Sequence, residues 1–261
     1  AFWRSLQNTS KLREYRDALL TGRGDSVAVA NDIIAAKKIT APEVRRNVQE
    51  CTRGIATVAR LLDEVTVLQK SPFTSANAEH EKMLETLWDL LRPGIVRSGG
   101  RVTSEWGEIG FQGKDPATDF RGGGLLGLHQ LLYFAEQRNE RARDMLTDGR
   151  IREVAKYPWS CCGINVTAEM VRMLEKRSCA LRLYTARTAE DAMRVFNDIY
   201  CDVFEYFHEA YALAEPTDVM GFPPKFKESI AQAEEALAKA GRVPIVPAPA
   251  ASDGPDTKKR N

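Results

Sequence analysis

Apolar side chains recur every three or four residues along most of this chain, which is the spacing of one face of an α-helix. The longest apolar stripe runs over 44–68 and follows a capping pattern at 40–43, with Pro42 in the first turn. A second stripe over 196–211, in a helix that opens on Thr188, predicts the most buried helix. Shorter repeats predict further helices at 10–20, 25–38, 84–91, 125–138, 167–177 and 224–240. Because no segment shows a convincing strand pattern, we predict an all-α, compact multi-helix fold without a sheet.

This periodicity stops between 92 and 124, where the chain has nine glycines and two prolines. A connection of this length is uncommon in a compact domain, and it is usually either functional or disordered. The stretch also contains bulky apolar residues that a disordered linker lacks, namely Trp106, Ile109, Phe111 and Phe120. We therefore predict an ordered loop that is held to the core by Trp106, Phe111 and Phe120.

The same patterns divide the chain into parts. Asp25 or Ser26 is expected to cap the helix at 25–38. The end of the chain is rich in proline, alanine and polar residues, which do not build a core. We expect four parts: N-terminal helices over 1–70 that pack on the core, a core domain over 71–215, a C-terminal helix over 216–240 and a flexible tail over 241–261.

Composition and charge exclude several classes of function. With 37 Lys and Arg against 36 Asp and Glu, the net charge is +1, which argues against a nucleic-acid binder held by phosphate contacts. No apolar run reaches the ~18–20 residues that would cross a bilayer. The five cysteines, including the adjacent pair Cys161–Cys162, show no CxxC spacing, and the three histidines complete no zinc-ligand pattern. We therefore expect reduced thiols and no metal site.

The end of the loop raises a question, because Arg121 stands directly before the glycines 122–124 and an apolar helix follows. Glycine loses more conformational freedom on folding than any other residue, so this run indicates a close backbone approach or an unusual dihedral angle. The letters of 122–127 match the GxGxxG dinucleotide fingerprint, but a polar stretch with Pro116 precedes them where the fingerprint needs a β-strand. A dinucleotide site is therefore not expected.

Two other interpretations of this junction remain. In the first, the glycines only permit a tight helix entry, and Arg121 forms a solvent-exposed ion pair with Asp115 or Asp119, worth ~1 kcal/mol or less. In the second, Arg121 is presented to a partner, because a guanidinium is always charged and its planar fork suits a phosphoryl group. The glycines would then let another surface approach. The free N–H groups of the helix that begins near Leu125 would add positive potential.

A set of residues with fixed spacing resembles the signature of the ELMO (engulfment and cell motility) domain. The later stretch CCGINVTAEMV, residues 161–171, is similar to a helix entry found downstream in the same domain. The resemblance is strongest over about 78–215, and it implies an all-helical fold. The matching positions of the signature are Trp106, Gly110, Phe111, Gln112, Pro116, Thr118, Asp119, Phe120, Arg121, Gly122, Gly124, Leu128 and Leu131.

Within this family, the chain resembles the proteins that act as GTPase-activating proteins for Arf-like small GTPases. Arg121 separates this branch from the scaffold branch, which assists Dock-type exchange factors, generally lacks the arginine and carries extra domains. The resemblance implies that Arg121 stabilises the transferring γ-phosphoryl group of a bound GTPase, with Asp119 orienting its guanidinium. A rival role for Arg121 is to hold the loop while the GTPase's own residues are reordered. Gln112 is expected to brace the loop through its side-chain amide, with placement of the attacking water as the alternative role. The other positions expected to brace the loop or contact the partner are Thr118, through its hydroxyl, Gly122 and Gly124.

The same resemblance implies that the chain needs no cofactor of its own, because GTP and Mg²⁺ would belong to the partner. It implies a regulator of another protein's hydrolysis with no turnover of its own. We expect a cytoplasmic protein whose association with organelle membranes is peripheral and goes through its partner. The alternative function is a non-catalytic scaffold or adaptor that binds small GTPases or a Dock-type exchange factor. His129, which lies among leucines, is interpreted as a packing residue and not a catalytic one.

Overall fold

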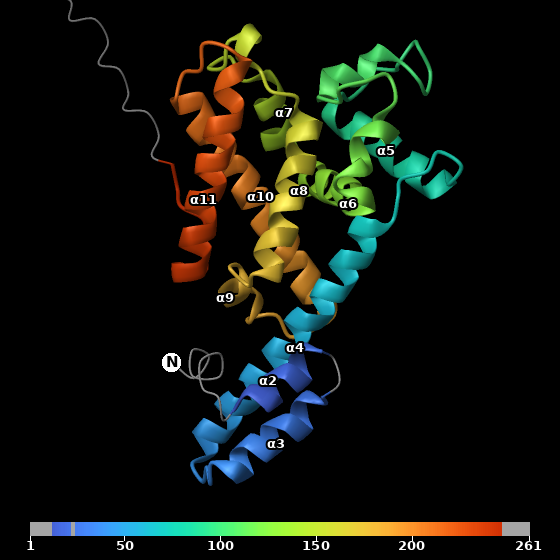
Figure 1. Ribbon diagram of the computed structural model, residues 1–261. Helices are drawn as coiled ribbons and strands as arrows, with labels where there is room; N and C mark the ends of the chain where they lie inside the picture. The colour runs from blue at the N-terminus through green and yellow to red at the C-terminus, as the bar shows by residue number, and fades with distance from the viewer. Residues whose placement is uncertain (1–11, 22–23, 247–261) are drawn as a thin grey trace, which may run out of the picture.

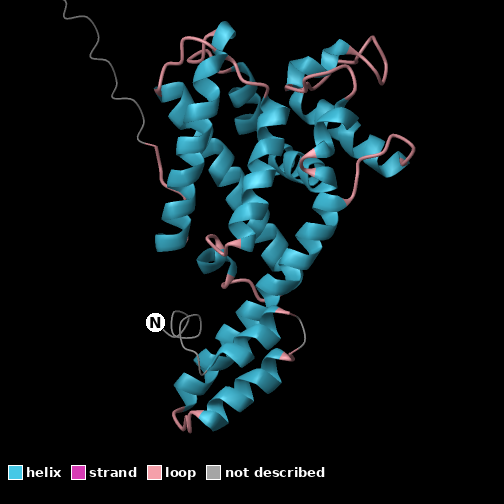
Figure 2. Cartoon of the chain, in the orientation of Figure 1, coloured by secondary structure: helices cyan, strands magenta, loops and turns pink. Residues whose placement is uncertain are grey.

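The computed structural model describes residues 12–21 and 24–246, and every regular element within them is a helix (Figure 2). No strand occurs in these residues, which confirms the predicted all-α fold. Residues 1–11 of the predicted N-terminal part and 247–261 of the predicted tail lie outside this description. The α-helices are α2 (Arg13–Leu20), α3 (Ser26–Ala36), α4 (Pro42–Lys70), α5 (Ala78–Leu91), α6 (Gly124–Gln137), α7 (Asn139–Thr147), α8 (Trp159–Glu175), α9 (Ala180–Leu183), α10 (Ala189–Leu213) and α11 (Phe222–Ala240). Shorter 3-10 helices are η2 (Ser104–Ile109), η3 (Pro116–Arg121), η4 (Glu153–Ala155) and η5 (Val219–Gly221).

Two hydrophobic clusters organise the molecule, and α4 runs through both of them (Figure 1). The smaller cluster is formed by α2, α3 and the first half of α4, and its last member is Ala56. The larger cluster begins at Val58 on the same helix and includes residues of every α-helix from α5 to α11. Because α4 is one continuous helix of 29 residues, it connects the two parts as a single rod.

Two helices begin at the caps that the sequence predicts. Asp25 caps α3, because its Oδ1 atom accepts hydrogen bonds from Val27 N at 2.8 Å and Ala28 N at 2.9 Å. Thr188 caps α10, because its Oγ1 atom accepts a hydrogen bond from Asp191 N at 3.0 Å. In both cases a side-chain oxygen satisfies backbone N–H groups that have no partner inside the helix.

The capping pattern predicted at 40–43 is wrong. α4 begins at Pro42, and its N-cap is Ala41, whose side chain accepts no hydrogen bond. Thr40 therefore lies one residue before the cap, where its hydroxyl is misplaced for the N–H groups of the first turn. The proline in the first turn is confirmed, and its missing N–H costs little there.

The sequence pattern places the start of α8 too late and gives no sign of α7. α8 begins at Trp159, not at 167, and it is buried on nearly every side. A helix without a polar face does not show the 3.6-residue alternation on which the prediction depends. Position 163, inside this helix, requires glycine, because a Cβ atom there would lie 2.5 Å from Leu131 Cδ2 and 2.6 Å from the Tyr200 hydroxyl.

α10 lies at the centre of the large core and contacts α4, α6, α8 and α11 (Figure 1). The apolar stripe predicted for this helix is buried, since Phe196, Ile199, Tyr200, Val203, Phe207 and Tyr211 are each 0 % exposed. α11 lies against α10 and buries Ile230, Ala233 and Leu237. Among the described helices, none is both long and apolar enough to cross a membrane.

Candidate functional site

The predicted loop between α5 and α6 is ordered around a chain of aromatic rings. Trp106 of η2 lies edge-on to Trp88 of α5, with ring centroids 5.6 Å apart, and edge-on to Phe111 at 6.0 Å. Phe111 contacts Phe120 of η3 at 5.6 Å. Phe120 also stacks on Phe73, from the turn between α4 and α5, at 5.3 Å. Because all five rings are at most 8 % exposed, they fix the loop to the large core.

Gly110 fixes one end of the segment that contains η3. Its φ angle is +86°, and a Cβ atom there would lie 2.1 Å from the backbone nitrogen of Trp159, at the start of α8. The carbonyl oxygen of Gly110 accepts a hydrogen bond from Cys161 N at 3.1 Å. Beside it, Ser160 Oγ donates to Ile109 O at 2.6 Å. The close approach of α8 and the left-handed φ angle therefore both require glycine at this position.

Gly124 fixes the other end of the segment against the last turn of α4. Its φ angle is +56°, and a Cβ atom there would lie 2.0 Å from Gln69 O. The next residue, Leu125, donates its backbone N–H to Ser71 O at 2.9 Å. This N–H group is therefore occupied, and the prediction that it is free at the helix start is wrong. Gly124 positions the loop by permitting contact with α4.

The other two glycines of the run have different surroundings. A Cβ atom at Gly123 would lie 3.1 Å from Ile164 Cγ2 of α8, so this glycine also serves internal packing. Gly122 is exposed, and no atom lies within 4 Å of the position of its Cβ. The surfaces that approach this run are thus α4 and α8 of the same chain. The interpretation that the glycines admit another protein is wrong for Gly123 and Gly124, and open space exists only beside Gly122.

Arg121 is the last residue of η3 and directly follows a buried aromatic ring. Its side chain is exposed, and it forms no ion pair or hydrogen bond with any residue of the described part. The two carboxylates expected to pair with it are engaged elsewhere. Asp115 pairs with Arg101 at 3.0 Å, and Asp119 accepts a hydrogen bond from Gln112 N at 3.0 Å. The predicted ion pair is therefore not formed, and Asp119 does not orient the guanidinium.

Asp119 instead braces the segment before Arg121. Besides the backbone of Gln112, its carboxylate is hydrogen-bonded to the thiol of Cys161 on α8. Burial, together with the charge of Asp119, raises the pKa of Cys161 to about 12, so this thiol stays protonated and is not a nucleophile. The side chain of Gln112 is exposed and bonds to no described residue. The brace therefore comes from the backbone N–H of Gln112 and not from its side-chain amide.

The start of η3 is closed by two further hydrogen bonds. Asp115 is the cap, since its Oδ1 atom accepts from Ala117 N at 3.0 Å. The hydroxyl of Thr118 donates to Asp115 O at 2.9 Å. Thr118 thus closes this turn as a donor, while the capping oxygen belongs to Asp115.

The other arginines near the loop differ from Arg121 because each holds a carboxylate. Arg92 pairs with Glu108 at 2.6 Å. Arg97 binds Glu85, and its guanidinium lies 3.8 Å from the ring centroid of Trp106. Arg101 binds Glu81 at 2.6 Å as well as Asp115. These three cations are part of the loop's own structure, whereas the charge of Arg121 is not neutralised within the described residues.

His129 lies on the outer side of α6. Its neighbours Leu128, Gln130 and Leu131 are buried, whereas His129 itself is exposed. The core-facing positions of this helix recur at 127, 128, 131, 134 and 135, and a residue at 129 falls on the opposite side of a 3.6-residue turn. The interpretation of His129 as a residue that packs among the leucines is therefore wrong.

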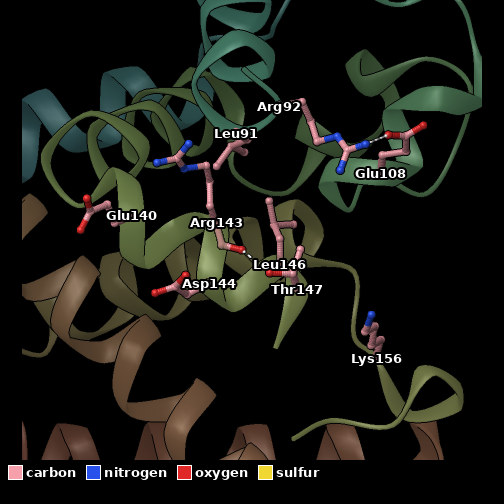
Figure 3. A pocket seen from close by; sticks show the side chains of 9 residues that line it. All are labelled: Leu91, Arg92, Glu108, Glu140, Arg143, Asp144, Leu146, Thr147 and Lys156. Carbon is pink, nitrogen blue, oxygen red and sulfur yellow. Dashed lines mark hydrogen bonds and ion pairs between the residues drawn. The ribbon is translucent and has the colours of Figure 1, made fainter. Parts of the chain in front are cut away.

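A surface cleft of about 770 Å³ lies between α5, η2 and α7 (Figure 3). Arg121 does not line this cleft. The charges that line it balance, because three cations face three carboxylates: Arg92, Arg143, Lys156, Glu108, Glu140 and Asp144. This balance gives the cleft no preference for an anionic ligand. Within the described residues, no group of three His, Cys, Asp or Glu side chains could hold a metal ion.

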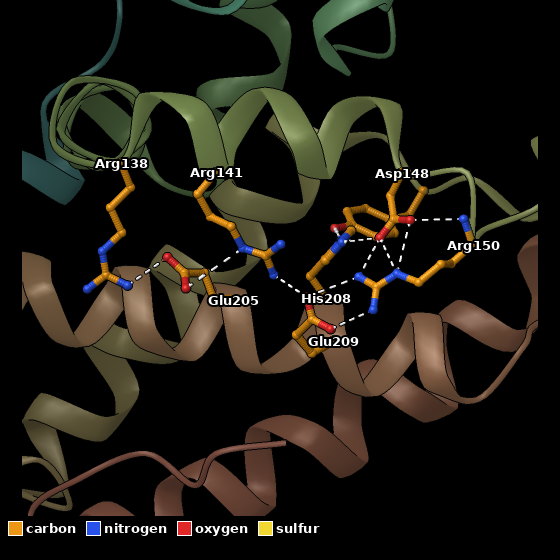
Figure 4. Close-up of polar contacts among 8 residues, drawn as sticks. Arg138, Arg141, Asp148, Arg150, Glu205, His208 and Glu209 are labelled. Atoms are coloured by element: carbon orange, nitrogen blue, oxygen red, sulfur yellow. Dashed lines mark hydrogen bonds and ion pairs between the residues drawn. The ribbon is translucent and has the colours of Figure 1, made fainter. Parts of the chain in front are cut away.

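A buried polar cluster connects α10 to the segment after α7 (Figure 4). His208 is 0 % exposed; its Nδ1 atom bonds to the Tyr157 hydroxyl at 2.7 Å and its Nε2 atom to Asp148 at 2.9 Å. Asp148 also pairs with Arg150 at 2.6 Å, and Arg150 reaches Glu209 at 2.8 Å. This cluster could not be predicted from the sequence, because a single histidine within an aromatic stripe does not reveal partners about 50 residues away in the chain.

Comparison with known proteins places these features in a family. ELMO domain-containing protein B of Dictyostelium discoideum is 40 % identical over 160 residues, which are 61 % of this chain and 54 % of that protein. ELMO domain-containing protein 2 of Mus musculus is 36 % identical over 183 residues, 69 % of this chain and 62 % of that protein. ELMO domain-containing protein 1 of Mus musculus is 32 % identical over 211 residues, 74 % of this chain and 64 % of that protein.

The chain therefore spans between 54 and 64 % of the length of these three relatives. No solved structure matches it. The model of the ELMO/CED-12 family matches residues 63–226, a range that contains the whole aromatic loop, both glycine contacts and Arg121. These matches confirm the resemblance inferred from the signature at 106–131. The chain belongs to the ELMO/CED-12 family.

Proposed function

We propose that this protein is a GTPase-activating protein that stimulates GTP hydrolysis by a small GTPase of the Arf or Arf-like class. In this proposal Arg121 enters the nucleotide site of the GTPase from outside. The observation that carries the proposal is the state of Arg121, which is exposed, free of ion pairs among the described residues and attached to an anchored 3-10 helix. The family membership supports it, as does the match of Arg121 to the ELMO signature.

The chemistry of phosphoryl transfer suits such a residue. Negative charge is spread over the oxygens of the transferring γ-phosphoryl group in the transition state, and a positioned guanidinium stabilises that charge. Arginine supplied in trans is typically worth ~10³–10⁵ in rate. Because Arg121 holds no carboxylate in the described part, no ion pair has to be broken before it meets the phosphate.

The surroundings of Arg121 fix the backbone from which its side chain extends. Phe120, the preceding residue, is 1 % exposed and contacts two other rings. The backbone on either side is fixed by Gly110 against α8 and by Gly124 against α4. Because the backbone is fixed, only the side chain of Arg121 has to be ordered when the complex forms, which favours transition-state stabilisation by a positioned charge.

In this proposal the GTPase contributes GTP, Mg²⁺ and the attacking water, and the present chain contributes no nucleophile. Gly122, which directly follows Arg121, and Gln112, at the other end of the same loop segment, are both exposed and are proposed to contact the GTPase. Asp119, Thr118 and Gly124 hold the loop from within. The proposal places the protein in the cytoplasm, where its partner brings it to membranes.

The experiment is a hydrolysis assay with a panel of Arf and Arf-like GTPases. Each is tested with the wild-type protein, with Arg121→Lys and with Arg187→Lys as the matched control. Arg187 is also exposed and binds no described residue, and it lies before α10, outside the loop. We expect Arg121→Lys to lose most of the stimulation, ~10³-fold or more, because lysine lacks the planar fork.

Two results would contradict the proposal. If Arg121→Lys stimulates as well as the wild type, the arginine is not the stimulating group. If the wild-type protein binds a GTPase but stimulates none of the panel, the non-catalytic scaffold or adaptor is the better description.

A further inference from the structure

The turn between α3 and α4 collects positive charge at the end of the smaller hydrophobic part. Within residues 37–46, Lys37, Lys38, Arg45 and Arg46 are all exposed, and Glu43 is the single carboxylate. This segment, which we call the basic tip, therefore has a net charge of +3 (four cations minus one carboxylate), although the whole chain has only +1. The positive charge is thus concentrated in this segment, although the net charge of the whole chain is close to zero.

The four cations of the basic tip are not used by the fold. None of their side chains forms an ion pair or hydrogen bond with a described residue. Several arginines of the larger part are engaged by carboxylates of α10: Asp202 holds Arg138 at 2.6 Å and also Arg182, and Glu209 holds Arg141. Four like charges with a single carboxylate among them repel one another, so an external anionic surface would stabilise this arrangement.

Aliphatic side chains accompany these cations. Val44 is 45 % exposed, Ile39 is partly exposed, and Ala41 and Pro42 are exposed between them. The segment forms the convex lower end of the molecule, where α3 turns into α4 (Figure 1). A convex end with interleaved cations and aliphatic groups cannot enclose a small ion. It fits a broad anionic surface with an apolar layer beneath its charges.

We propose that the basic tip binds the surface of a bilayer that contains anionic phospholipids. The cations would meet the headgroups, while Val44 and Pro42, which are both exposed, reach the boundary of the acyl chains. Peripheral binding by protein segments depends on this combination of charge and apolar contact. The segment has no aromatic residue to stack on bases, and a duplex presents no apolar layer for its aliphatic side chains. A nucleic acid is therefore the less suitable partner.

The size of the effect follows from the number of cations. Each Lys or Arg near an anionic membrane surface strengthens binding about fivefold, and the attraction is screened by salt. Replacing two of the four by glutamate removes two attractions and adds two repulsions. We therefore expect binding to fall by at least about 25-fold.

The test uses the full chain and vesicles of phosphatidylcholine with or without phosphatidylserine, in a flotation assay at low and high salt. The tip variant is Lys37→Glu/Arg45→Glu. The control is Arg187→Glu/Lys227→Glu, which changes the net charge equally at two exposed positions of the larger part. Circular dichroism and thermal unfolding verify that all three proteins are folded. No GTPase is present, so the outcome is independent of the function proposed for Arg121.

The expected result is binding to phosphatidylserine vesicles that the tip variant loses, that the control retains within about twofold and that high salt weakens. Absence of binding by the wild type, or equal losses in the two variants, would overturn the proposal. Binding of a short DNA duplex or of polyglutamate as strong as binding to the vesicles would also overturn it, in favour of a general polyanion site.

Discussion

Arg121 is set apart from the neighbouring arginines by what surrounds it. Arg92, Arg97 and Arg101 each hold a carboxylate, whereas Arg121 follows an anchored ring and holds none within the described residues. Three of these arginines thus form ion pairs that stabilise the loop, and the guanidinium of the fourth can bind an external anion. An available guanidinium on a fixed backbone needs only desolvation and ordering of its own side chain to meet an external anion.

The conformation of Gly124 leads to a prediction for stability. In Gly124→Ala, the new Cβ atom would occupy a left-handed residue, at φ +56°, and would lie 2.0 Å from the carbonyl oxygen of Gln69. Left-handed backbone costs a non-glycine residue roughly 1–2 kcal/mol, and the overlap with a helix backbone adds a similar amount. We expect the free energy of unfolding, measured by urea denaturation, to fall by about 3 kcal/mol or more.

Gly122→Ala is the matched control for this prediction. Gly122 has a helical φ angle of −85°, and its Cβ would meet open space. Alanine is compatible with this conformation, so stability should stay unchanged or rise by up to ~1 kcal/mol. Equal losses in the two variants would show that the contact between Gly124 and α4 is not what requires glycine.

The sequence permitted part of this site to be predicted. The bulk of Trp106, Phe111 and Phe120 indicated an ordered loop, because such side chains seek burial. The contact between Phe120 and Phe73 could not be predicted, because Phe73 is a single aromatic residue between two helices and belongs to no periodic pattern. The contact between Gly124 and Gln69 could not be predicted either, because it depends on how α4 is placed against α6.

At the scale of elements, the segment with η3 is held between α8 and α4. Gly110 contacts the start of α8, and Gly124 contacts the end of α4. Amphipathic helices such as α10 were predictable, because their apolar stripe contrasts with polar residues. The early start of α8 was not, because a helix that is buried on nearly every side has no such contrast.

The cluster around His208 predicts how stability depends on pH. A neutral ring suits its two partners, with Nε2–H donating to Asp148 and Nδ1 accepting from the Tyr157 hydroxyl. Burial lowers the pKa of His208 from 6.5 to about 4. Between these two values the unfolded chain binds a proton that the folded chain excludes, so the free energy of unfolding should fall as the pH falls through this window. The loss should be on the order of 3 kcal/mol at full extent.

Urea denaturation at several pH values between pH 4 and 7 measures this slope, with His208→Gln as the variant. Glutamine can bond to both partners but does not titrate, so the slope should flatten in the variant. The carboxylates of the cluster lose their contribution at lower pH, since hydrogen bonds from Arg150 hold the pKa of Glu209 at about 2. A slope that is the same in both proteins would assign the effect to other groups.

At the scale of the whole molecule, α4 joins the basic tip to the loop with Arg121. Its first turn belongs to the tip, and its last turn contacts Gly124. A helix of 29 residues is roughly 40 Å long, which exceeds the ~30 Å diameter of a small domain. A tip bound to a bilayer would leave space for a membrane-attached GTPase beside α4, an arrangement that rests on the proposed function. The net charge of +1 gave no sign of this polarity, because segregated charges cancel in a sum.

The central claim is that Arg121 stabilises the transition state of a partner's GTP hydrolysis. The most direct measurement compares affinities for the partner GTPase loaded with GDP alone and with GDP plus aluminium fluoride, which imitates the transferring phosphoryl group. We predict that the wild-type protein binds the aluminium fluoride state at least ~10²-fold more tightly, as expected for a transition-state mimic. Arg121→Ala should lose this preference while Arg187→Ala keeps it. A preference that persists without Arg121 would contradict the account.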